Sequence, residues 1–449
     1  MSETALHTDV AAVGAGFAGL AAARALHAAG LDTLVLEARD RTGGRAHTRR
    51  LADGTSVDLG GQWIGPTQDA LYELCAEFGI ETYPLPAHGA PVYRVGDTVT
   101  GDLPGGVQDL LDRVDALAVD LDTTAPWDHP EAATLDAQTL RHWLTLQDVG
   151  SDDEKDLVGR MLAGGLQTVT ASETSMLALA FYLRSGGGVA RLLDAEGGAQ
   201  QDRIVGGPQA VTDAMAAALP AGTVRFSEPV RTIDRTDAER IVLTTASGTV
   251  VARHVVVAVP AALVPSMLDI VPALPVPKRI ALGRLQSGIA LKTNLVYDRP
   301  FWREQGLSGQ SNHSRGVVTE TADGTTPDAV GGVLTAFSYG EDAIALRRTD
   351  AENRAELIAR ALVPTFGDDV LNYREVAATD WATETFTGGC FSAGFGPGAL
   401  SVVGRDLRGA VGPIHFAGTE YAHVWNGYFE GAVRSGRSAA AAILAERRG

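Results

Sequence analysis

The sequence predicts an α/β protein that begins with a Rossmann-type dinucleotide-binding unit and carries a second, inserted domain. Residues 8–45 contain in succession a short apolar run, the turn GAGFAG, an alanine-rich helical stretch and a second apolar run ending at Glu37. This order of strand, glycine turn, helix, strand and acid is typical of a nucleotide-binding βαβ unit. At 449 residues the chain is also too long for one simple core, which favours two domains.

Each residue of the turn has a separate physical role in this unit. Gly14 lets the chain turn tightly out of the strand, and Gly16 lets backbone N–H groups approach a pyrophosphate at the helix N-terminus. Gly19 allows the helix to lie close to the sheet, and Glu37 stands at the offset expected for the acid that binds a ribose hydroxyl. Taken alone, the stretch predicts a dinucleotide and does not distinguish NAD from FAD.

Composition and charge narrow the class of protein. The shares of hydrophobic residues (45%) and charged residues (20%) are those of an ordinary globular protein. A formal net charge of −18 argues against nucleic acid or an anionic membrane surface as a partner. Without a signal segment or a transmembrane run, we expect a cytoplasmic protein with no membrane partner. Two cysteines exclude a disulfide framework, and no metal-ligand cluster is evident, so no metal is expected.

The segment after Glu37 continues the nucleotide-binding pattern. Gly43, Gly44 and Arg45 could bring further backbone N–H groups and one fixed cation to the same pyrophosphate, or they could form a plain polar loop. A strand is expected at residues 57–65, followed by an amphipathic helix over 68–78. In that helix Cys75 follows the apolar spacing and is expected in the core.

The middle of the chain loses the βαβ rhythm between residues 83 and 202. Helical patterns cover residues 110–121, 139–146, 153–162 and 175–183, with a glycine-rich break at 186–188. They predict an inserted, mostly helical domain.

The first domain then resumes from Arg203. A helix is expected over 209–218, strands over 223–233 and 240–259 with a turn at Ser247-Gly248, and a strand of the second domain over 288–297.

Motifs spread over most of the chain resemble the flavin-dependent amine oxidase family, of which the monoamine oxidases are the best-known members. They are GAGFAGLAAARAL, LEARDRTGGR and DLGGQWIGPTQ near the start, and the stretches 205–207, Lys292, 381–390 and 416–433 later on. The resemblance implies a Rossmann-type FAD-binding domain formed by residues 1–82, 203–287 and 400–449. It implies an inserted, discontinuous α+β substrate-binding domain formed by 83–202 and 288–399. FAD as cofactor, an amine and O2 as substrates, and a homodimer are further expectations of the resemblance.

The resemblance also implies a set of cofactor-binding residues. They are Gly14, Gly16, Gly19, Glu37, Arg39, Gly44, Arg45, Gly61, Gln62, Trp63, Val230, Trp381, Cys390, Gly418 and Glu420. Val230 matches the segment that holds the adenine end of FAD through its backbone, and Glu420 is expected against the cofactor. In covalent members of the family, the cysteine that matches Cys390 forms a thioether to the flavin, whereas many relatives bind FAD without a bond. A linked flavin and an unlinked buried thiol both stay open.

Three residues are implied in the reaction itself. By residue type, Lys292 in a half-apolar strand would be a snorkelling surface lysine. The resemblance implies instead that it contacts flavin N5 through a water, and that Phe391 and Tyr428 form two aromatic walls beside the amine. Monoamine oxidases most often have two tyrosines there, so Phe391 is a departure that removes one hydroxyl. Aromatic walls desolvate an amine and lower its pKa.

The reaction implied is oxidation of a primary amine. A hydride passes from the amine α-carbon to flavin N5, the imine hydrolyses to an aldehyde and ammonia, and O2 is reduced to hydrogen peroxide.

The identity of the amine is less defined. Leu166, Gln167, Leu193 and Gln200 lie near cavity-lining positions by resemblance, although the leucines are equally suited to a core. Glu320 resembles the glutamate with which bacterial putrescine oxidases hold the distal ammonium of a diamine. By residue type it is expected to be a solvated loop acid. We therefore expect primary monoamines first, with a diamine oxidase, an amino-acid oxidase and a non-enzymatic flavin-binding protein as alternatives.

Overall fold

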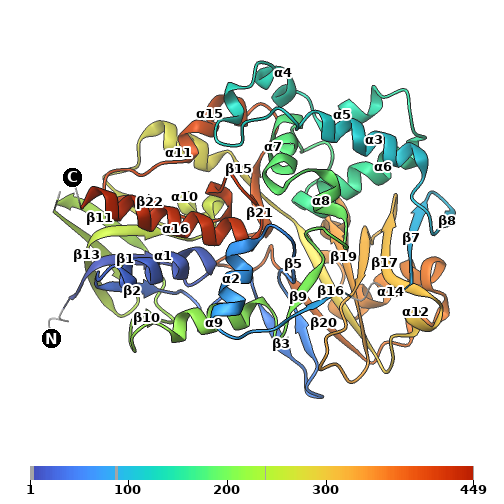
Figure 1. The fold of residues 1–449 in the computed structure, drawn as a ribbon, viewed down its shortest axis with the longest axis horizontal. Helices are drawn as coiled ribbons and strands as arrows, with labels where there is room; N and C mark the ends of the chain where they lie inside the picture. Colours follow the sequence, from blue (N-terminus) through green and yellow to red (C-terminus); the bar gives the residue numbers. More distant parts are fainter. Residues whose placement is uncertain (1–4, 86–88, 238, 448–449) are drawn as a thin grey trace.

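The structure is a computed structural model that describes residues 5–85, 89–237 and 239–447. Figure 1 shows two large β-sheets, one on each side of the molecule, with helices packed over both. Helices and strands both contribute to each half, which confirms the predicted mixed α/β class.

The first sheet contains the predicted βαβ unit. Strand β1 (Leu6–Val13) pairs in parallel with β2 (Thr33–Leu36), and helix α1 (Phe17–Ala28) connects them. The eight-stranded sheet has the order β10–β2–β1–β13–β12–β11–β14, with β22 beside β13. The additional strands are β10 (Val224–Arg225), β11 (Thr232–Asp237), β12 (Arg240–Thr245), β13 (Gly248–Val257), β14 (Asp269–Val271) and β22 (Ile414–Phe416).

Helices cover both faces of this sheet. Val10 and Ala12 of β1 belong to one hydrophobic cluster, whereas Ala11 and Val13 belong to another, because successive side chains of a strand point to opposite faces. The first face carries α1, α2 (Asp69–Glu77), α9 (Pro208–Ala217) and α16 (Phe429–Glu446). The second carries η3 (Ala261–Leu263), α10 (Val264–Met267), α11 (Val276–Gly283) and α15 (Leu400–Leu407).

The second sheet has seven strands in the order β20–β16–β19–β18–β17–β7–β8. They are β7 (Ala90–Val95), β8 (Thr98–Thr100), β16 (Ala290–Tyr297), β17 (Leu307–His313), β18 (Glu320–Asp323), β19 (Gly332–Tyr339) and β20 (Glu375–Asp380). Every residue of β16 and β19 is buried, so these two strands lie at the centre of this half.

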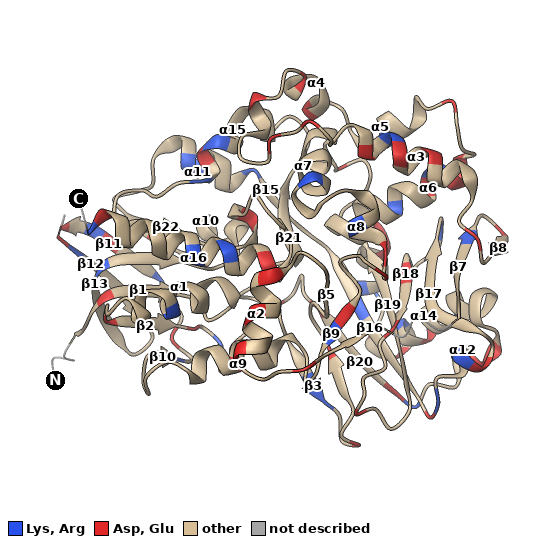
Figure 2. Ribbon diagram, viewed as in Figure 1, with Lys and Arg blue, Asp and Glu red and all other residues tan. Residues whose placement is uncertain are grey.

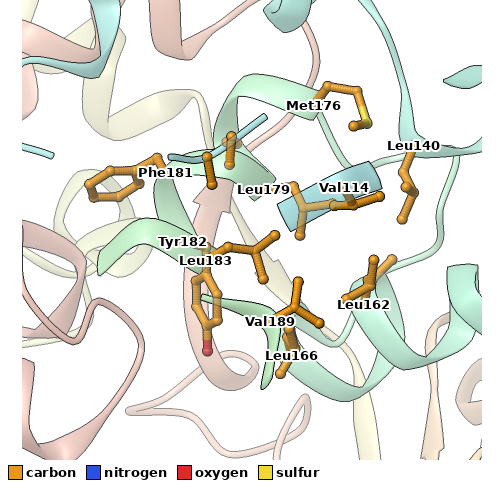
Figure 3. Close-up of a cluster of buried hydrophobic side chains, with 14 of the residues drawn as sticks. Val114, Leu140, Leu162, Leu166, Met176, Leu179, Phe181, Tyr182, Leu183 and Val189 are labelled. Atoms are coloured by element: carbon orange, nitrogen blue, oxygen red, sulfur yellow. The ribbon is translucent and has the colours of Figure 1, made fainter. Parts of the chain in front are cut away.

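A helical layer covers one side of the second sheet. It contains α3 (Gly105–Ala116), η1 (Pro126–Asp128), α4 (Ala132–Ala137), α5 (Leu140–Thr145), α6 (Asp152–Gly159), the π-helical turn η2 (Arg160–Gly165), α7 (Met176–Gly186) and α8 (Val189–Leu193). Figure 3 shows its core, in which leucines and valines from these helices meet and the ring of Tyr182 projects from α7. The helical character predicted for this region is confirmed.

The remaining elements are short or peripheral. They are α12 (Phe301–Glu304), α13 (Gly340–Arg347), α14 (Ala351–Phe366), η4 (Asp368–Leu371) and η5 (Thr419–Tyr421), with the strands β3 (Thr48–Arg50), β4 (Ser56–Asp58), β5 (Trp63–Ile64), β6 (Thr82–Pro84), β9 (Asp202–Ile204), β15 (Leu285–Gly288) and β21 (Cys390–Phe395). None of the helices in the described ranges combines the length and the apolarity that crossing a bilayer requires.

Three of the expected strands have the wrong extent. Residues 57–65 divide between β4 and β5, which belong to different sheets. Residues 223–233 form β10 and β11 with a break between them, because Ser227 takes a left-handed conformation (φ 57°) and donates its N–H to the carbonyl of Arg39. Residues 288–297 divide between β15 and β16, which belong to different sheets. Cys75 is buried in α2, as expected.

Candidate active site

The glycine turn after β1 opens into a cavity of about 1060 Å³. Its walls come from segments far apart in the chain. Of the predicted cofactor-binding residues, Gly14, Gly16, Glu37, Arg39, Gly44, Arg45, Val230 and Gly418 line it. The glycine turn and the acid of the βαβ unit therefore lie in the wall of one cavity.

The glycines of the turn differ in what they make room for. A Cβ on Gly14 would lie 2.9 Å from the carbonyl oxygen of Ala258, and Gly14 has φ 110°. A Cβ on Gly19 would lie 2.0 Å from the carbonyl oxygen of Gly14, so this glycine lets α1 pack against the turn. Gly16 has only the carbonyl of Gly43 within reach, at 3.8 Å, so it leaves space in the cavity at the N-terminus of α1. That space, together with the helix dipole, fits a pyrophosphate.

Glu37 directly follows β2 at the edge of the same cavity and is buried. Its carboxylate accepts the N–H of Ala15 at 2.7 Å and that of Arg39 at 2.9 Å. Each carboxylate oxygen has a second lone-pair site, so Glu37 retains the capacity to accept a ribose hydroxyl.

Arg45 lines both this cavity and a second one, and it forms an ion pair with Glu420, which is buried behind it. Nη1 of Arg45 lies 2.5 Å from Oε1 of Glu420 and donates to the carbonyl of Phe391 at 2.6 Å. Burial disfavours the charge of Arg45, but the pairing with Glu420 outweighs it and raises the pKa of Arg45. Phe391 takes a positive φ of 52°, an unfavourable conformation for a residue with a side chain, and Arg45 holds its carbonyl in place.

The second cavity, of about 810 Å³, shares Arg45, Phe391 and Tyr428 with the first. Its other walls include the predicted residues Gly61, Gln62, Trp63, Leu166, Gln200, Lys292, Trp381 and Cys390. The two cavities therefore adjoin, and Phe391 and Tyr428 both face the place where they meet.

Lys292 lies on β16 with only 3% of its surface exposed, so the surface position expected from its residue type is wrong. Its Nζ donates to the carbonyl of Gly60 at 2.7 Å and to the side-chain oxygen of Gln62. Burial lowers the pKa of Lys292 to about 7. At neutral pH this amine can therefore hold or release a proton.

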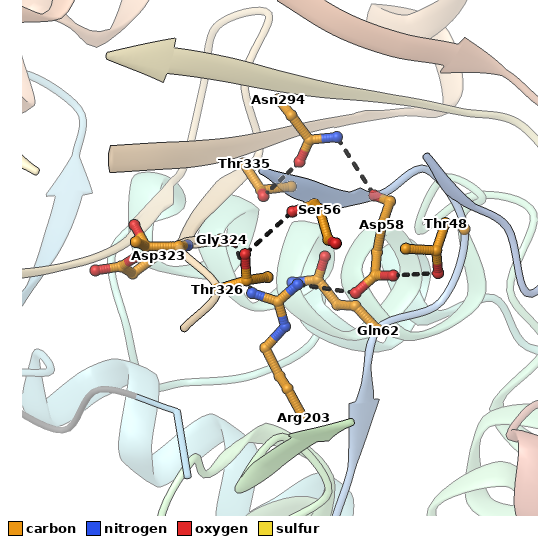
Figure 4. Close-up of polar contacts among 12 residues, drawn as sticks. Thr48, Ser56, Asp58, Gln62, Arg203, Asn294, Asp323, Gly324, Thr326 and Thr335 are labelled. Carbon is orange, nitrogen blue, oxygen red and sulfur yellow. Dashed lines mark hydrogen bonds and ion pairs between the residues drawn. The ribbon is translucent and has the colours of Figure 1, made fainter. Parts of the chain in front are cut away.

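A buried polar network fixes the segment that faces Lys292. Asp58 of β4 pairs with Arg203 of β9 at 2.8 Å, and Arg203 also donates to the carbonyl of Gly324 at 2.7 Å (Figure 4). Asn294, two residues after Lys292 on β16, donates to the carbonyl of Asp58 at 3.3 Å. These contacts hold the strand that leads to residues 60–63 against the second sheet.

Cys390 is a buried free cysteine in the wall of the second cavity. Burial raises the pKa of its thiol to about 12, so no thiolate is present at neutral pH.

Glu320 occupies a different environment from the one expected. It begins β18 instead of lying in a solvated loop, and its carboxylate is enclosed by Gly165 of the π-helical turn and by Tyr339, whose hydroxyl donates to it at 2.6 Å. Burial raises the pKa of Glu320, and the hydrogen bond from Tyr339 offsets this only in part. The loop prediction failed because a Glu-Thr-Ala-Asp run before a turn gives no sign that its first residue faces inward.

The strand register places Glu320 and Lys292 on the same face of the second sheet. Both residues pair with Phe337, Lys292 from one side and Glu320 from the other. Neighbouring strands lie about 4.8 Å apart, so the two backbones are separated by about 10 Å across the sheet. Phe337 and Lys292 line the second cavity, and Glu320 lies next in the same row.

Two of the predicted substrate-binding residues, Gln167 and Leu193, do not line the second cavity. Gln167 lines a separate cavity that also includes Glu420, and Leu193 packs against the helical core instead of lining either of the two adjoining cavities. Gly19 is covered by the turn itself, as described above.

The sequence did not single out the tyrosines that complete the aromatic surroundings. The ring of Tyr182 lies 6.1 Å from that of Tyr428, and the ring of Tyr339 lies 5.9 Å from that of Phe391. The position of Tyr339 two residues after Phe337, on the strand that pairs with β16, could have indicated it only if the strand pairing had been known.

Several buried polar atoms that face the cavities have no hydrogen-bond partner within the described chain. They are Oγ1 of Thr419, Nε2 of Gln62 and Nε1 of Trp63. Buried polar groups are normally satisfied, so these atoms point to a polar ligand that spans both cavities. With the open space at Gly16, they fit a flavin dinucleotide.

Comparisons with known proteins agree with this geometry. The model of the family described as flavin containing amine oxidoreductase matches residues 17–444. Putrescine oxidase from Kocuria rosea is 37% identical over 99% of this chain and 96% of its own length. A solved structure of putrescine oxidase bound to putrescine covers 98% of this chain and 100% of that chain, with 35% identity and a TM-score of 0.93. Cyclohexylamine oxidase from Brevibacterium oxydans gives 32% identity, the same coverage and a TM-score of 0.93.

The matches cover nearly the whole length of this chain and of the relatives. They include the residues that line both cavities. The chain therefore belongs to the family of flavin-containing amine oxidoreductases and is an FAD-dependent amine oxidase.

Proposed function

We propose that this enzyme oxidises primary amines in the cavity between Lys292 and Tyr428, and that its preferred substrates carry a second ammonium group. The single observation that supports the second part is Glu320. Glu320 is half-buried next to the cavity, with its carboxylate against Gly165 and Tyr339, and among the described residues no Lys, Arg or His forms an ion pair with it. A buried carboxylate is costly unless a cation accompanies it, and a diamine would supply one.

The proposed cofactor site uses the first cavity. Gly14, Gly16 and Gly44 give the backbone access to a pyrophosphate, Glu37 takes ribose hydroxyls, and Arg45 sits beside the flavin end. FAD supplies the two-electron acceptor for the amine and passes the electrons to O2.

The proposed substrate site uses the second cavity. Phe391 and Tyr428 desolvate the amine, so that its nitrogen is neutral and has a free lone pair. Lys292 is held by Gly60 and Gln62, and with a pKa near neutrality it positions a water and can hold or release a proton at Nζ. We propose that the two sheets correspond to the two domains, with residues 1–82, 203–287 and 400–449 holding FAD and the rest shaping this cavity.

Monoamines are the second candidate. The larger part of the wall is apolar or aromatic, with Leu166, Phe337 and Phe391 at the cavity, and such a surface accepts an alkyl or aromatic tail without a second charge. One of the similar solved structures is named cyclohexylamine oxidase, and cyclohexylamine is a monoamine with an apolar ring.

A peroxide-coupled assay with Glu320→Gln tests whether diamines or monoamines are the preferred substrates. Straight-chain diamines and monoamines of matched length are compared in wild type and variant. If Glu320 holds the distal ammonium, the variant loses at least about 30-fold in kcat/KM for diamines, equivalent to about 2 kcal/mol, and keeps its monoamine activity. Equal losses for both series would contradict the diamine assignment, and the amine oxidase assignment would still stand.

We further propose that Cys390 is the attachment point for FAD, on the strength of its place in the wall of the second cavity. Acid denaturation should then leave flavin on wild-type protein and release it from Cys390→Ala. Flavin released from the wild type would contradict the bond. Attachment would replace the S–H bond of Cys390 and one C–H bond of a flavin methyl group by a C–S bond. A base would take up the two protons, and the two electrons would reduce the flavin, which O2 would then reoxidise.

A further inference from the structure

Two histidines and a glutamate meet beside the first sheet, under the last turn of α16. His254 is on β13, His415 is on β22 and Glu446 is the last residue of α16. Nδ1 of His254 and Nε2 of His415 each lie 3.7 Å from Oε2 of Glu446, and the three atoms all lie within 4.8 Å of one another.

The fold itself brings the two imidazoles together. β13 and β22 are parallel, and His415 pairs with Val256. Side chains two apart on a strand share a face, so His254 projects on the same face as Val256 and His415. Val256 belongs to the hydrophobic cluster that α16 covers, so this face lies under the helix that ends at Glu446.

Both facing nitrogens lack a partner. Nδ1 of His254 and Nε2 of His415 are buried, and neither makes a hydrogen bond within the described chain. Two buried imidazole nitrogens and a carboxylate oxygen therefore face one another without a hydrogen bond, which is an unfavourable arrangement unless something binds there.

The spacing suits a metal ion. Zinc binds imidazole nitrogen at about 2.0–2.1 Å and carboxylate oxygen at about 2.0–2.2 Å, so ligand atoms of a tetrahedral site lie about 3.4 Å apart. The 3.7 Å separations of the carboxylate oxygen from the two imidazole nitrogens exceed this by a few tenths of an ångström. The two nitrogens lie within 4.8 Å of each other, so the imidazole rings must also turn toward each other to share an ion. The side chain of Glu446 is 47% exposed at the end of a helix, so it can move by that amount.

We propose that His254, His415 and Glu446 form a binding site for a divalent first-row transition-metal ion of the zinc class. Neutral imidazoles with one carboxylate are the ligands such ions prefer, and three protein ligands leave a fourth position for water.

The ion has a structural role, because the site lies at the opposite end of α16 from the cavities. The helix begins at Phe429, which lines both cavities, and its 18 residues span about 27 Å. An ion at Glu446 fastens the last turn of α16 to β13 and β22 and takes no part in amine oxidation.

Three charged neighbours set the strength of the site. Arg253 and Arg447 oppose a cation near His254, whereas Asp9 favours it. Asp9 also pairs with Arg253 at 3.5 Å, which reduces the opposition. Removing the positive charge with Arg447→Ala should tighten metal binding several-fold.

The test uses the flavin-loaded enzyme, treated with a chelator and titrated with Zn²⁺ by isothermal titration calorimetry. We expect one zinc per chain, bound in the micromolar range or tighter, and at least tenfold weaker binding in Glu446→Gln and in His254→Ala. Flavin content and amine turnover should not change. His142→Gln removes an exposed imidazole from α5 and is the matched control, with unchanged zinc affinity. Zinc binding that is absent, or equally strong in the Glu446 and His254 variants, would overturn the proposal.

A second measurement does not depend on any variant folding. X-ray absorption at the zinc edge of the wild-type enzyme with one equivalent of Zn²⁺ should show two imidazoles and oxygen ligands at about 2.0–2.1 Å. A spectrum with oxygen ligands alone would place the zinc elsewhere and refute the site.

Discussion

Among the described residues, Lys292 is the one lysine in the wall of the amine cavity, and Lys292→Met replaces it. Lys292 is buried on β16, and its Nζ donates to the carbonyl of Gly60 and to the side chain of Gln62. Burial lowers its pKa from 10.5 to about 7. Methionine has a similar length and no charge, so Lys292→Met removes the buried cation and leaves most of the packing.

The size of the effect follows from the pKa. A shift from 10.5 to about 7 makes the charged form of Lys292 about 5 kcal/mol less favourable in the folded protein, because one pKa unit corresponds to about 1.4 kcal/mol. Between these values the unfolded chain keeps a proton that the folded protein has released, so the free energy of unfolding rises with pH. The destabilisation is complete below about pH 7 and vanishes above about pH 10.5. From about pH 6 to about pH 9 it falls by about 2.7 kcal/mol.

Urea denaturation of the flavin-loaded enzyme, followed by far-ultraviolet circular dichroism, measures this change. Other titrating groups are common to both proteins and cancel in the difference between variant and wild type. The advantage of Lys292→Met over wild type should be about 2.7 kcal/mol larger at about pH 6 than at about pH 9. Parallel pH profiles for Lys292→Met and wild type would refute the reasoning.

Three further substitutions test the surroundings of the site. Asp58→Asn leaves the guanidinium of Arg203 buried without its counter-charge and should lower the free energy of unfolding by about 3–5 kcal/mol, measured by urea denaturation. Gly19→Ala places a methyl group 2.0 Å from a backbone carbonyl of the turn, and the purified protein should carry less flavin, seen in the visible absorbance. Tyr339→Phe removes the hydroxyl that donates to Glu320, raises the pKa of that carboxyl further and should raise KM for diamines several-fold with little effect on monoamines.

Each of these has an outcome that contradicts it. Restored stability is expected when the buried pair is replaced as a whole, in Asp58→Leu with Arg203→Met, and a double variant no better than the single one would argue against an unpaired charge as the cause. Gly105→Ala, with nothing within 4 Å of the added methyl, should keep its flavin. Equal changes in KM for both classes of amine would contradict the role of Tyr339.

The first domain could be predicted from the sequence because its signals are local. The strand, the turn at Gly14 to Gly19 and the acid at Glu37 lie within about thirty residues. Each has a steric or electrostatic cause that can be recognised from neighbouring residues in the sequence. The amine cavity could not be predicted in this way. Whether Glu320 faces solvent or the cavity depends on its pairing with Phe337 and on the turn at Gly165, and neither is encoded near it.

Lys292 and the cluster of His254, His415 and Glu446 show the same limit of prediction from a single sequence. Spacing alone gave Lys292 the wrong environment, and only the resemblance to a family indicated its burial. For His254 and His415 there was no family pattern to follow, and they meet because β13 and β22 are parallel neighbours in one sheet. Long-range strand pairing, which single-sequence patterns do not contain, decides both cases.

The Arg45–Glu420 pair also bears on which substrates the enzyme accepts. Arg45 is the one arginine among the described residues that line the amine cavity, and an amino acid would need such a cation for its carboxylate. Its guanidinium already donates to Glu420 and to the carbonyl of Phe391, and the side chain of Glu420 is fully buried. Turning Arg45 toward a substrate would leave that carboxylate buried without a counter-charge, at a cost of about 3–5 kcal/mol, which corresponds to more than about 100-fold in affinity. The same contact would release the carbonyl that keeps Phe391 in its left-handed conformation, and the wall beside the amine would be lost with it. We therefore infer that the cavity selects amines without a carboxylate, and that Glu320 adds a preference for a second positive charge.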